Sequence, residues 1–352
     1  MTETDDIKFI RRCVELASKA EGMTYPNPVV GAVIVYEGKI IGEGYHLKAG
    51  GPHAEVLAID SVKDRQKLSG STLYVSLEPC SHFGKTPPCT SLIINSKIPV
   101  VVAGTIDTSD KVCGNGFAML REAGIKVIHD IAQDECRWIN RRFFTFHEKK
   151  RPYIILKWAQ SSDGFIDYKR VRNKPQGPGW ITGNSEKILV HRWRATEQSI
   201  LVGAETARND NPLLNVREWS GNNPVRLILS GSGLLPENLS MNSLIGSQVI
   251  FTFHPDRLNH STSVIVKLNK KEPAALQVVD YLYKWGIQSL FIEGGTKVLN
   301  HFISTGLWDE ARIFHGKQVF QEGIKAPEIE GKLLSKTKFS NSILEFIINN
   351  RR

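Results

Sequence analysis

The sequence predicts an α/β protein of two domains, because short β-branched runs alternate with segments of helical spacing along the whole chain. That alternation is typical of mainly parallel sheets covered by helices. The chain has 352 residues, more than the roughly 250 to 300 at which a single core usually stops growing. A charged run ending in proline, at 146–152, separates two alternating halves. We therefore expect domains at 1–148 and 149–352.

The first half is expected to begin with a helix, since apolar residues recur at helical spacing from Asp6 to Ala20. Pro26 and Pro28 end this pattern, and a hairpin turning at Glu37-Gly38 follows. The elements expected after the first helix are strands at 31–36 and 39–44, a helix at 54–62, a strand at 71–77, a helix at 90–96 and a strand at 100–103.

The second half repeats the alternation with its own set of elements. Strands are expected at 154–158, 199–203, 225–229, 248–253, 289–292 and 311–314, with helices at 185–196, 274–285 and 296–304. The turn Glu293-Gly294-Gly295 joins a buried strand to a helix, where backbone amides can approach a phosphate. Close packing of strand and helix is the more frequent reason for such glycines, and the dinucleotide fingerprint G-x-G-x-x-G is absent, so this turn alone is a weak signal.

Charge and composition exclude several classes of protein. The chain carries 45 Lys and Arg against 36 Asp and Glu, a net charge of +9, but the basic residues are scattered and no aromatic-rich basic stripe accompanies them. Its apolar stretches are far shorter than the roughly 20 residues that span a bilayer. The acidic, polar start differs from a secretory signal. We expect a cytoplasmic homo-oligomer that binds neither nucleic acid nor membranes and has a small-molecule substrate.

The clearest chemical signal is the set His53, Cys80 and Cys89. One imidazole and two thiolates leave zinc with an open fourth position, which is typical of a catalytic site. Cys89 follows two prolines at the start of an expected helix, where the helix dipole lowers the pKa of a thiol. His82 could compete as a ligand, but we expect it to pack or to contact substrate. The alternative is a surface histidine and two core thiols.

Glu55 lies two positions beyond His53, in the opening turn of the same expected helix. It can face a zinc-activated water without being a ligand itself. In that place it would take a proton from the water and return it to departing ammonia, as in zinc deaminases. The sequence therefore predicts a zinc-dependent deaminase of a pyrimidine.

The spacing of the two cysteines narrows the substrate. Nucleic-acid and nucleoside deaminases of this type usually carry Cys-x-x-Cys, whereas Cys80 and Cys89 are separated by eight residues. With this insertion the chain resembles the RibD family, bifunctional deaminase and reductase enzymes of riboflavin biosynthesis. The matching words are Pro26-Asn27-Pro28, Gly42-Glu43-Gly44-Tyr45-His46, Pro52-His53-Ala54-Glu55 and Leu77-Glu78-Pro79-Cys80-Ser81-His82-Phe83-Gly84-Lys85-Thr86-Pro87-Pro88-Cys89.

For the first half, the resemblance implies a cytidine-deaminase-like fold with three α/β/α layers. It implies deamination of 2,5-diamino-6-(5-phosphoribosylamino)pyrimidin-4-one. Four residues would help to hold that substrate: Asn27, His46, Lys85 and Asp107. Lys85 and His46 would lie near its phosphate or ring. Where the family commonly has an asparagine, this chain has Ser109.

For the second half, the resemblance implies a dihydrofolate-reductase-like domain that uses NADPH to convert the ribosyl group of the product to ribityl. The shared words include Ser161-Ser162-Asp163-Gly164, Trp180-Ile181-Thr182 and Asp210-Asn211-Pro212. The implied cofactor contacts are Trp180, Thr206, Asp210, Gly294, Gly295, Thr296, Lys297, Val298 and Leu299. The implied substrate contacts are Lys157, Asp163, Arg194, Leu214, Arg217 and Glu293, with arginines clamping a phosphate.

Some features of this half leave alternatives open. Pro178-Gly179 and Gln160 depart from the family pattern, so a domain that binds ligand without catalysis is a second hypothesis. Asp163 could be a turn residue or a ring contact. The basic stretch 169–178 could be a flap or a solvated loop. Cys13, Cys113 and Cys136 have no ligand spacing and are expected to be structural thiols.

Overall fold

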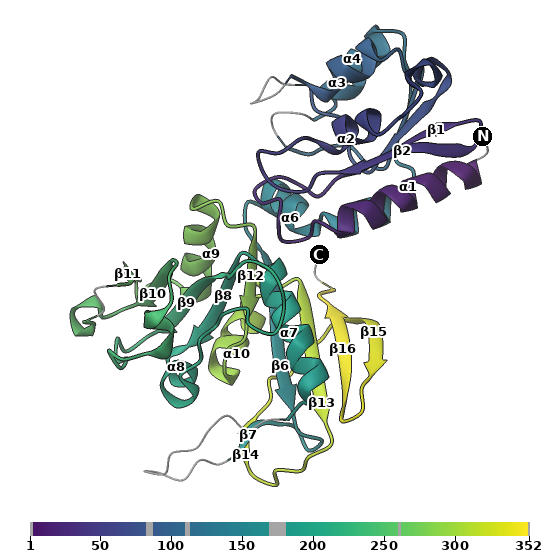
Figure 1. The fold of residues 1–352 in the computed structure, drawn as a ribbon. Coiled ribbons are helices and arrows are strands. Elements are labelled where there is room, and N and C mark those ends of the chain that lie inside the picture. The colour runs from purple at the N-terminus through teal and green to yellow at the C-terminus, as the bar shows by residue number, and fades with distance from the viewer. Residues whose placement is uncertain (1–2, 82–86, 110–112, 169–180, 260–261, 351–352) are drawn as a thin grey trace. The chain divides into compact units, whose positions relative to one another are not determined.

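The computed structural model describes residues 3–81, 87–109, 113–168, 181–259 and 262–350. The chain forms two compact units, Met1–Lys150 and Arg151–Arg352 (Figure 1). The first unit contains α1 (Glu3–Ser18), β1 (Gly31–Tyr36), β2 (Lys39–Tyr45), α2 (Ala54–Asp60), η1 (Arg65–Gly70), β3 (Thr72–Val75), α3 (Cys89–Asn95), β4 (Val100–Ala103), α4 (Asn115–Glu122), β5 (Lys126–Ile128), α5 (Gln133–Ile139) and α6 (Arg141–Lys149).

The sheet of the first unit lies between two layers of helices. Its strand order is β2-β1-β3-β4-β5, with β3, β4 and β5 parallel. Alternate residues of β1 face opposite sides, so Ile34 packs with α2, α3 and α4 while Val33 packs with α1 and α5. Gly42 and Gly44 let β2 approach α2, because a Cβ at either would overlap the backbone of Ala58. This is a three-layer α/β/α arrangement.

The hairpin predicted at Glu37-Gly38 is confirmed, and it makes β1 the exception in a sheet whose other inner pairs are parallel. This strand pairs antiparallel with both β2 and β3. The reason lies in the two-residue turn between β1 and β2, where Glu37 has φ 48° and Gly38 has φ 73°. Such a left-handed pair makes a tight hairpin, which joins only antiparallel strands.

The charged run at 146–152 is not a break between elements. Residues up to Lys149 form the last turn of α6, because the helix buries Phe143 and Phe144 while its charged end stays exposed. The helices α4 and α5 and the strand β5 were also not expected from the sequence. They are short, at seven to eight residues for the helices, and the strand has three.

The second unit is built on a nine-stranded sheet of order β11-β10-β9-β8-β12-β6-β13-β16-β15. The strands of the run β11-β10-β9-β8-β12-β6-β13 are all parallel to one another. The strand β16 is antiparallel to both of its neighbours, β13 and β15. The bounds are β6 (Tyr153–Gln160), β7 (Phe165–Tyr168), α7 (Asn184–Thr196), β8 (Ser199–Gly203), α8 (Ala204–Asp210), β9 (Val225–Ser230), η2 (Ser240–Ser243), β10 (Gln248–Thr252), η3 (Pro255–Arg257), β11 (Val264–Lys267), α9 (Ala274–Lys284), β12 (Ser289–Ile292), α10 (Thr296–Ser304), β13 (Glu310–Gly316), β14 (Gly323–Lys325), β15 (Lys332–Lys338) and β16 (Ser342–Ile348).

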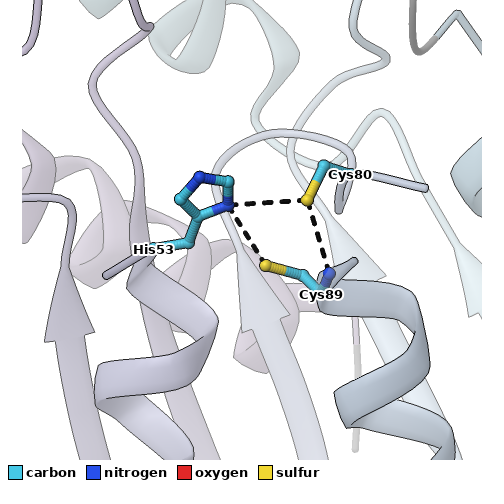
Figure 2. Close-up of side chains that lie close together, drawn as sticks. All are labelled: His53, Cys80 and Cys89. Carbon is cyan, nitrogen blue, oxygen red and sulfur yellow. Dashed lines mark hydrogen bonds between the residues drawn. The ribbon is translucent and has the colours of Figure 1, made fainter. Parts of the chain in front are cut away.

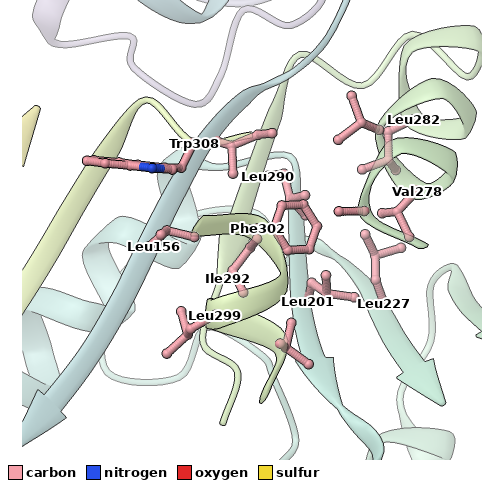
Figure 3. Packing of buried hydrophobic residues seen from close by; sticks show 14 of the residues in the cluster. Leu156, Leu201, Leu227, Val278, Leu282, Leu290, Ile292, Leu299, Phe302 and Trp308 are labelled. Carbon is pink, nitrogen blue, oxygen red and sulfur yellow. The ribbon is translucent and has the colours of Figure 1, made fainter. Parts of the chain in front are cut away.

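Helices cover both faces of this sheet. On one face, Leu156, Leu201 and Leu290 pack against Val278 of α9 and Phe302 of α10 (Figure 3). On the other face, α7 packs its Val190 and Trp193 against the alternate residues of β6 and β8. The loops that follow the parallel strands therefore gather at one edge, where α/β proteins bind ligands.

None of the helices in the described ranges is both long and apolar enough to cross a membrane.

Candidate functional site

Three segments of the first unit bring His53, Cys80 and Cys89 together (Figure 2). His53 is the N-cap of α2, Cys80 follows β3, and Cys89 is the first residue of α3. The His53 Nδ1 lies 3.3 Å from Cys89 Sγ and 3.5 Å from Cys80 Sγ. All three donor atoms lie within 4.8 Å of one another.

The donor separations fit a zinc ion. Zinc bonds of about 2.1 Å to nitrogen and about 2.3 Å to sulfur, at tetrahedral angles, place such donors about 3.6 Å apart. The separations of 3.3 and 3.5 Å are close to this value. Among the described residues, this is the one group of three or more His, Cys, Asp or Glu side chains arranged to hold a metal. Three protein ligands leave one position for water or substrate.

The two thiols differ in their ionisation. The pKa of Cys80 is lowered, chiefly by a hydrogen bond from the Cys89 thiol and also by His53. The backbone N–H of Cys89 also donates to Cys80 Sγ, at 3.3 Å. The pKa of Cys89 is raised, because its proton is held by the Cys80 thiolate and the side chain is buried. Of the two thiols, Cys80 is therefore the one whose ionised form, the form that binds metal, is favoured by its surroundings.

Glu55 is 4% exposed, in the first turn of α2. Burial, with a smaller contribution from Cys80, raises its pKa to about 7. Both the protonated and the ionised forms are accessible near neutral pH, which suits a side chain that takes up and releases a proton.

His46 connects a predicted substrate residue to the turn that carries a metal ligand. Its Nδ1 lies 3.0 Å from the Pro52 carbonyl oxygen, and its Nε2 lies 3.1 Å from Asn27 Nδ2. Since the carbonyl can only accept, Nδ1 carries the hydrogen and Nε2 accepts from the Asn27 amide. Burial lowers the pKa of His46, which favours the neutral ring. His46 therefore orients Asn27 and the turn at Pro52.

Asp107 lies 6% exposed in the loop after β4. Its Oδ1 accepts from the backbone N–H of Ser109 at 2.7 Å. Its own N–H donates to Glu78, a buried carboxylate that the sequence reasoning missed. Lys85 and His82 lie outside the described residues.

The second unit contains a cavity of about 940 Å³ at the carboxyl ends of its parallel strands. The loops after β8, β9, β10 and β12 line it. Of the residues predicted to bind the cofactor or substrate, it brings together Lys157, Thr206, Asp210, Glu293, Gly294, Gly295, Thr296, Lys297 and Val298. Leu299 is fully buried in the core beneath, and Trp180 lies outside the described residues.

The turn before α10 forms a cradle that fits the phosphates of a dinucleotide. A Cβ at Gly294 would lie 2.9 Å from Val298 Cβ, and one at Gly203 would lie 2.8 Å from Val298 Cγ2. Glycine is therefore needed for the close approach of β8 and α10. Gly295 is the N-cap of α10 and no side chain caps this end. The first amides of the helix are left for a ligand, and an anion is favoured there.

Glu293, which directly precedes the glycine turn, lies near two cations. Arg194 donates to it through Nε at 2.7 Å and Nη2 at 2.9 Å, and Lys157 Nζ lies 3.9 Å away. Burial raises the pKa of Glu293, but the attraction of Arg194 and Lys157 outweighs it and lowers the pKa to about 2. The fork of Arg194 is engaged by Glu293, and its Nη1 donates to the Asn215 carbonyl. It does not stand open as a phosphate clamp.

Three other predicted substrate residues lie apart from the cavity lining. The carboxylate of Asp163 accepts from Ser161 Oγ in its own turn and from the N–H groups of Phe320 and Gln321, which are distant in sequence. Leu214 is 2% exposed in the core beside α7. The N–H of Arg217 donates to His191 Nδ1, a part-buried contact that the sequence reasoning missed.

Of the residues that depart from the family pattern, the structure describes Gln160 but not Pro178 or Gly179. Gln160 accepts a hydrogen bond from Trp158 Nε1 at 2.7 Å. The stretch 169–178, which includes Pro178, lies outside the described residues, as does Gly179. Of the thiols expected to be structural, Cys13 and Cys136 are buried and Cys113 is exposed.

Two family models match the chain, one in each unit. The cytidine and deoxycytidylate deaminase zinc-binding region matches residues 3–105, and the RibD C-terminal domain matches residues 152–320. The riboflavin biosynthesis protein RibD of Aquifex aeolicus is 36% identical over 92% of this chain and 90% of its own length. That of Synechocystis is 34% identical over 93% of this chain and 88% of its own.

Solved structures agree with these matches over the whole length. A diaminohydroxyphosphoribosylaminopyrimidine deaminase/5-amino-6-(5-phosphoribosylamino)uracil reductase from Thermotoga maritima is 34% identical, with a TM-score of 0.89 over 99% of both chains. RibD from Acinetobacter baumannii is 28% identical, with a TM-score of 0.87 over 99% of this chain and 100% of that one.

Proposed function

Because the chain belongs to the RibD family of riboflavin biosynthesis proteins, it is a bifunctional zinc-dependent deaminase and NADPH-dependent reductase, and we propose which residues carry each reaction. The first reaction deaminates 2,5-diamino-6-(5-phosphoribosylamino)pyrimidin-4-one. The second reduces the ribosyl group of that product to ribityl. The observation that carries the proposal is the convergence of His53 Nδ1 and two cysteine sulfurs beside a buried glutamate.

In the deaminase unit, His53, Cys80 and Cys89 would hold zinc. When bound, zinc supplies a Lewis acid that activates water, and in the other unit NADPH supplies a hydride. Glu55 would accept one proton as water adds to the amine-bearing ring carbon, and would give this proton to the leaving nitrogen, so that ammonia departs. The second proton of the water ends on the adjacent ring nitrogen, so that a ring carbonyl forms. A pKa of about 7 lets one carboxyl group perform both transfers.

Substrate binding in this unit is assigned to Asn27, His46, Lys85 and Asp107. The contacts of His46 support an indirect role for it, in which the neutral ring fixes the Asn27 amide. With Nδ2 committed to His46, the Asn27 oxygen is the atom that would accept from an N–H of the pyrimidine. Asp107 would contact the substrate from the loop after β4, the strand next to β3.

In the reductase unit, the proposed cofactor contacts are Trp180, Thr206, Asp210 and the turn Gly294–Val298, with Leu299 supporting the turn from the core. Lys157 and Glu293 would face the ribosyl group. Arg194 holds Glu293 in place and ionised, and the Glu293 carboxylate partly offsets the burial that lowers the pKa of Lys157. Asp163, Leu214 and Arg217 would act at the border of the substrate site.

A C-terminal unit that binds ligand without catalysis was the second hypothesis. The full-length match to a deaminase/reductase supports the bifunctional function instead. We also propose that the two activities divide near residue 148, that the enzyme acts in the cytoplasm, and that it is a homo-oligomer. Its free thiols suit a reducing compartment. Light scattering on the purified enzyme would test the assembly.

A coupled assay tests the proposed function. The purified chain is given the phosphoribosylated diaminopyrimidine with and without NADPH, and ammonia and NADPH are followed together. Ammonia release should occur in both cases, with NADPH oxidised in proportion when it is present. Ammonia release without NADPH oxidation would leave only the deaminase.

A further inference from the structure

We infer that Glu78 is a positioning residue of the deaminase that holds the start of the loop after β4 in register with the metal ligand Cys80. This inference rests on the proposed deaminase function of the first unit. Glu78 is 4% exposed, two residues before Cys80, and neither the proton transfer nor the metal requires it.

The carboxylate of Glu78 accepts hydrogen bonds only from backbone amides. Oε2 accepts from Asp107 N at 3.2 Å and Gly114 N at 3.0 Å. Oε1 accepts from Gly116 N at 2.8 Å and Phe117 N at 3.3 Å. Within the described part of the chain no Lys or Arg pairs with this side chain. A buried carboxylate without a cation is costly, and here the amides at the positive end of α4 compensate for its charge.

These bonds tie together two loops that leave neighbouring parallel strands at the same edge of the sheet. Cys80 is on the loop after β3, and Asp107 is on the loop after β4. The Glu78 backbone N–H also donates to the Thr105 carbonyl, at 3.0 Å. Main chain and side chain of one residue therefore both hold the segment that begins the second loop.

The helix α4 is held against the same point. Gly116 lies so close to Pro79 that a Cβ there would overlap its carbonyl oxygen, and would lie 3.2 Å from Glu78 Cγ. Only glycine allows this approach. Cys80 is fixed from the other side, where its carbonyl accepts from Thr90 N at 3.2 Å. The contacts with Thr105, Asp107 and Gly116 thus determine how far the wall formed by the second loop stands from the metal ligands.

A glutamine at position 78 has nearly the same shape but carries an NH₂ group where the amides require an acceptor. Two of the four hydrogen bonds would be replaced by facing donors. The ligands themselves are untouched, so zinc should stay bound while the substrate fits less well. This separates a positioning role from a purely structural one.

The test compares Glu78→Gln with Glu122→Gln, the same substitution at an exposed site on α4. For Glu78→Gln we expect one zinc per chain, a deaminase KM raised at least tenfold, kcat changed less than KM, and unaltered NADPH oxidation with supplied deaminated product. Glu122→Gln should match the wild type. An unchanged KM, or loss of zinc in step with activity, would overturn the inference.

Two further variants cover the case in which Glu78→Gln does not fold. Glu78→Asp keeps the charge but shortens the reach, and should raise KM less than the glutamine. Gly116→Ala strains the same contact from the amide side, and should also raise KM with zinc retained. A wild-type KM in Gly116→Ala would contradict the inference. Absence of ammonia release by the wild-type chain would instead remove the proposed function.

Discussion

Arg194 on α7 donates two hydrogen bonds to the carboxylate of Glu293, which follows β12. The Nε–Oε1 distance is 2.7 Å and the Nη2–Oε2 distance is 2.9 Å. Both side chains are 11% exposed. The Lys157 Nζ lies 3.9 Å from Glu293 Oε2, the oxygen that also accepts from Arg194 Nη2. A planar fork on a buried carboxylate restricts its orientation more than a point charge would. The pair therefore fixes the residue that precedes the glycine turn of the cofactor cavity.

The first prediction concerns acid stability. The pKa of Glu293 falls from its ordinary value of 4.5 to about 2 in the folded chain. Its ionised form thus stabilises the fold above pH 4.5, and this contribution is lost as the pH falls from 4.5 toward 2. The loss amounts to on the order of 3 kcal/mol. In Glu293→Gln, the free energy of unfolding should depend less on pH across this window.

Urea unfolding of the full chain, followed by tryptophan fluorescence, measures this effect. Glu330→Gln is the control, because Glu330 is an exposed carboxylate on the same unit. It should leave the pH dependence nearly unchanged. Equal pH dependence in the wild type and Glu293→Gln would contradict the assigned pKa.

A second prediction follows from the shape of the arginine. Arg194→Lys keeps the charge but cannot form the fork, and it loses the bond to the Asn215 carbonyl. A shift of Glu293 by about 1 Å can cost about a hundredfold in rate. We expect the reductase kcat/KM to fall about tenfold to a hundredfold with deamination unaltered. Arg192→Lys, at the exposed neighbouring position, should retain full activity in the same NADPH assay.

The metal ligands give a third prediction. Cys80→Ser and Cys89→Ser should each lose zinc and ammonia release, because a serine hydroxyl is a far poorer ligand than a thiolate. NADPH oxidation with supplied deaminated product should persist. Zinc content is measured by mass spectrometry, with exposed Cys113→Ser as the control. Full zinc occupancy in either ligand variant would show that the metal is held elsewhere.

The glycine turn gives a fourth prediction. A Cβ at Gly295 would lie 3.4 Å from Thr206 Oγ1, so Gly295→Ala should fold. The added methyl group would stand where the amides of α10 meet a phosphate. We expect the KM for NADPH to rise roughly tenfold, about 1.4 kcal/mol of binding. Ser304→Ala, at the far end of α10, should leave KM unchanged. A normal KM for Gly295→Ala would place the phosphates elsewhere.

Much of the deaminase site could be predicted from sequence, because its chemistry lies in residue types at recognisable spacing. An imidazole and two thiols are typical zinc ligands, so the sequence predicts a metal site at His53, Cys80 and Cys89. The structure brings their donor atoms together. Glu55 follows from its place beside His53. The strands predicted at 31–36 and 100–103 agree with β1 and β4, because buried runs of β-branched residues strongly favour a strand.

Other relationships could not be predicted, because they depend on tertiary structure. Arg194 and Glu293 are 99 residues apart in sequence, and nothing local marks them as partners. Glu78 lies in a recognisable sequence motif, but the positioning role that we infer for it depends on hydrogen bonds from backbone amides far along the chain. The strand β15 was missed because all its residues are exposed and no apolar alternation marks it.

The measurement that tests the central claim most directly is Glu55→Gln, assayed for zinc, ammonia and NADPH oxidation on the same preparation. The claim is that Glu55 moves the protons of a deaminase site that is separate from the reductase site on one chain. We predict full zinc content, ammonia release reduced by about a hundredfold or more, and normal NADPH oxidation with supplied deaminated product. Wild-type ammonia release in Glu55→Gln would contradict the account, as would loss of NADPH oxidation with that product.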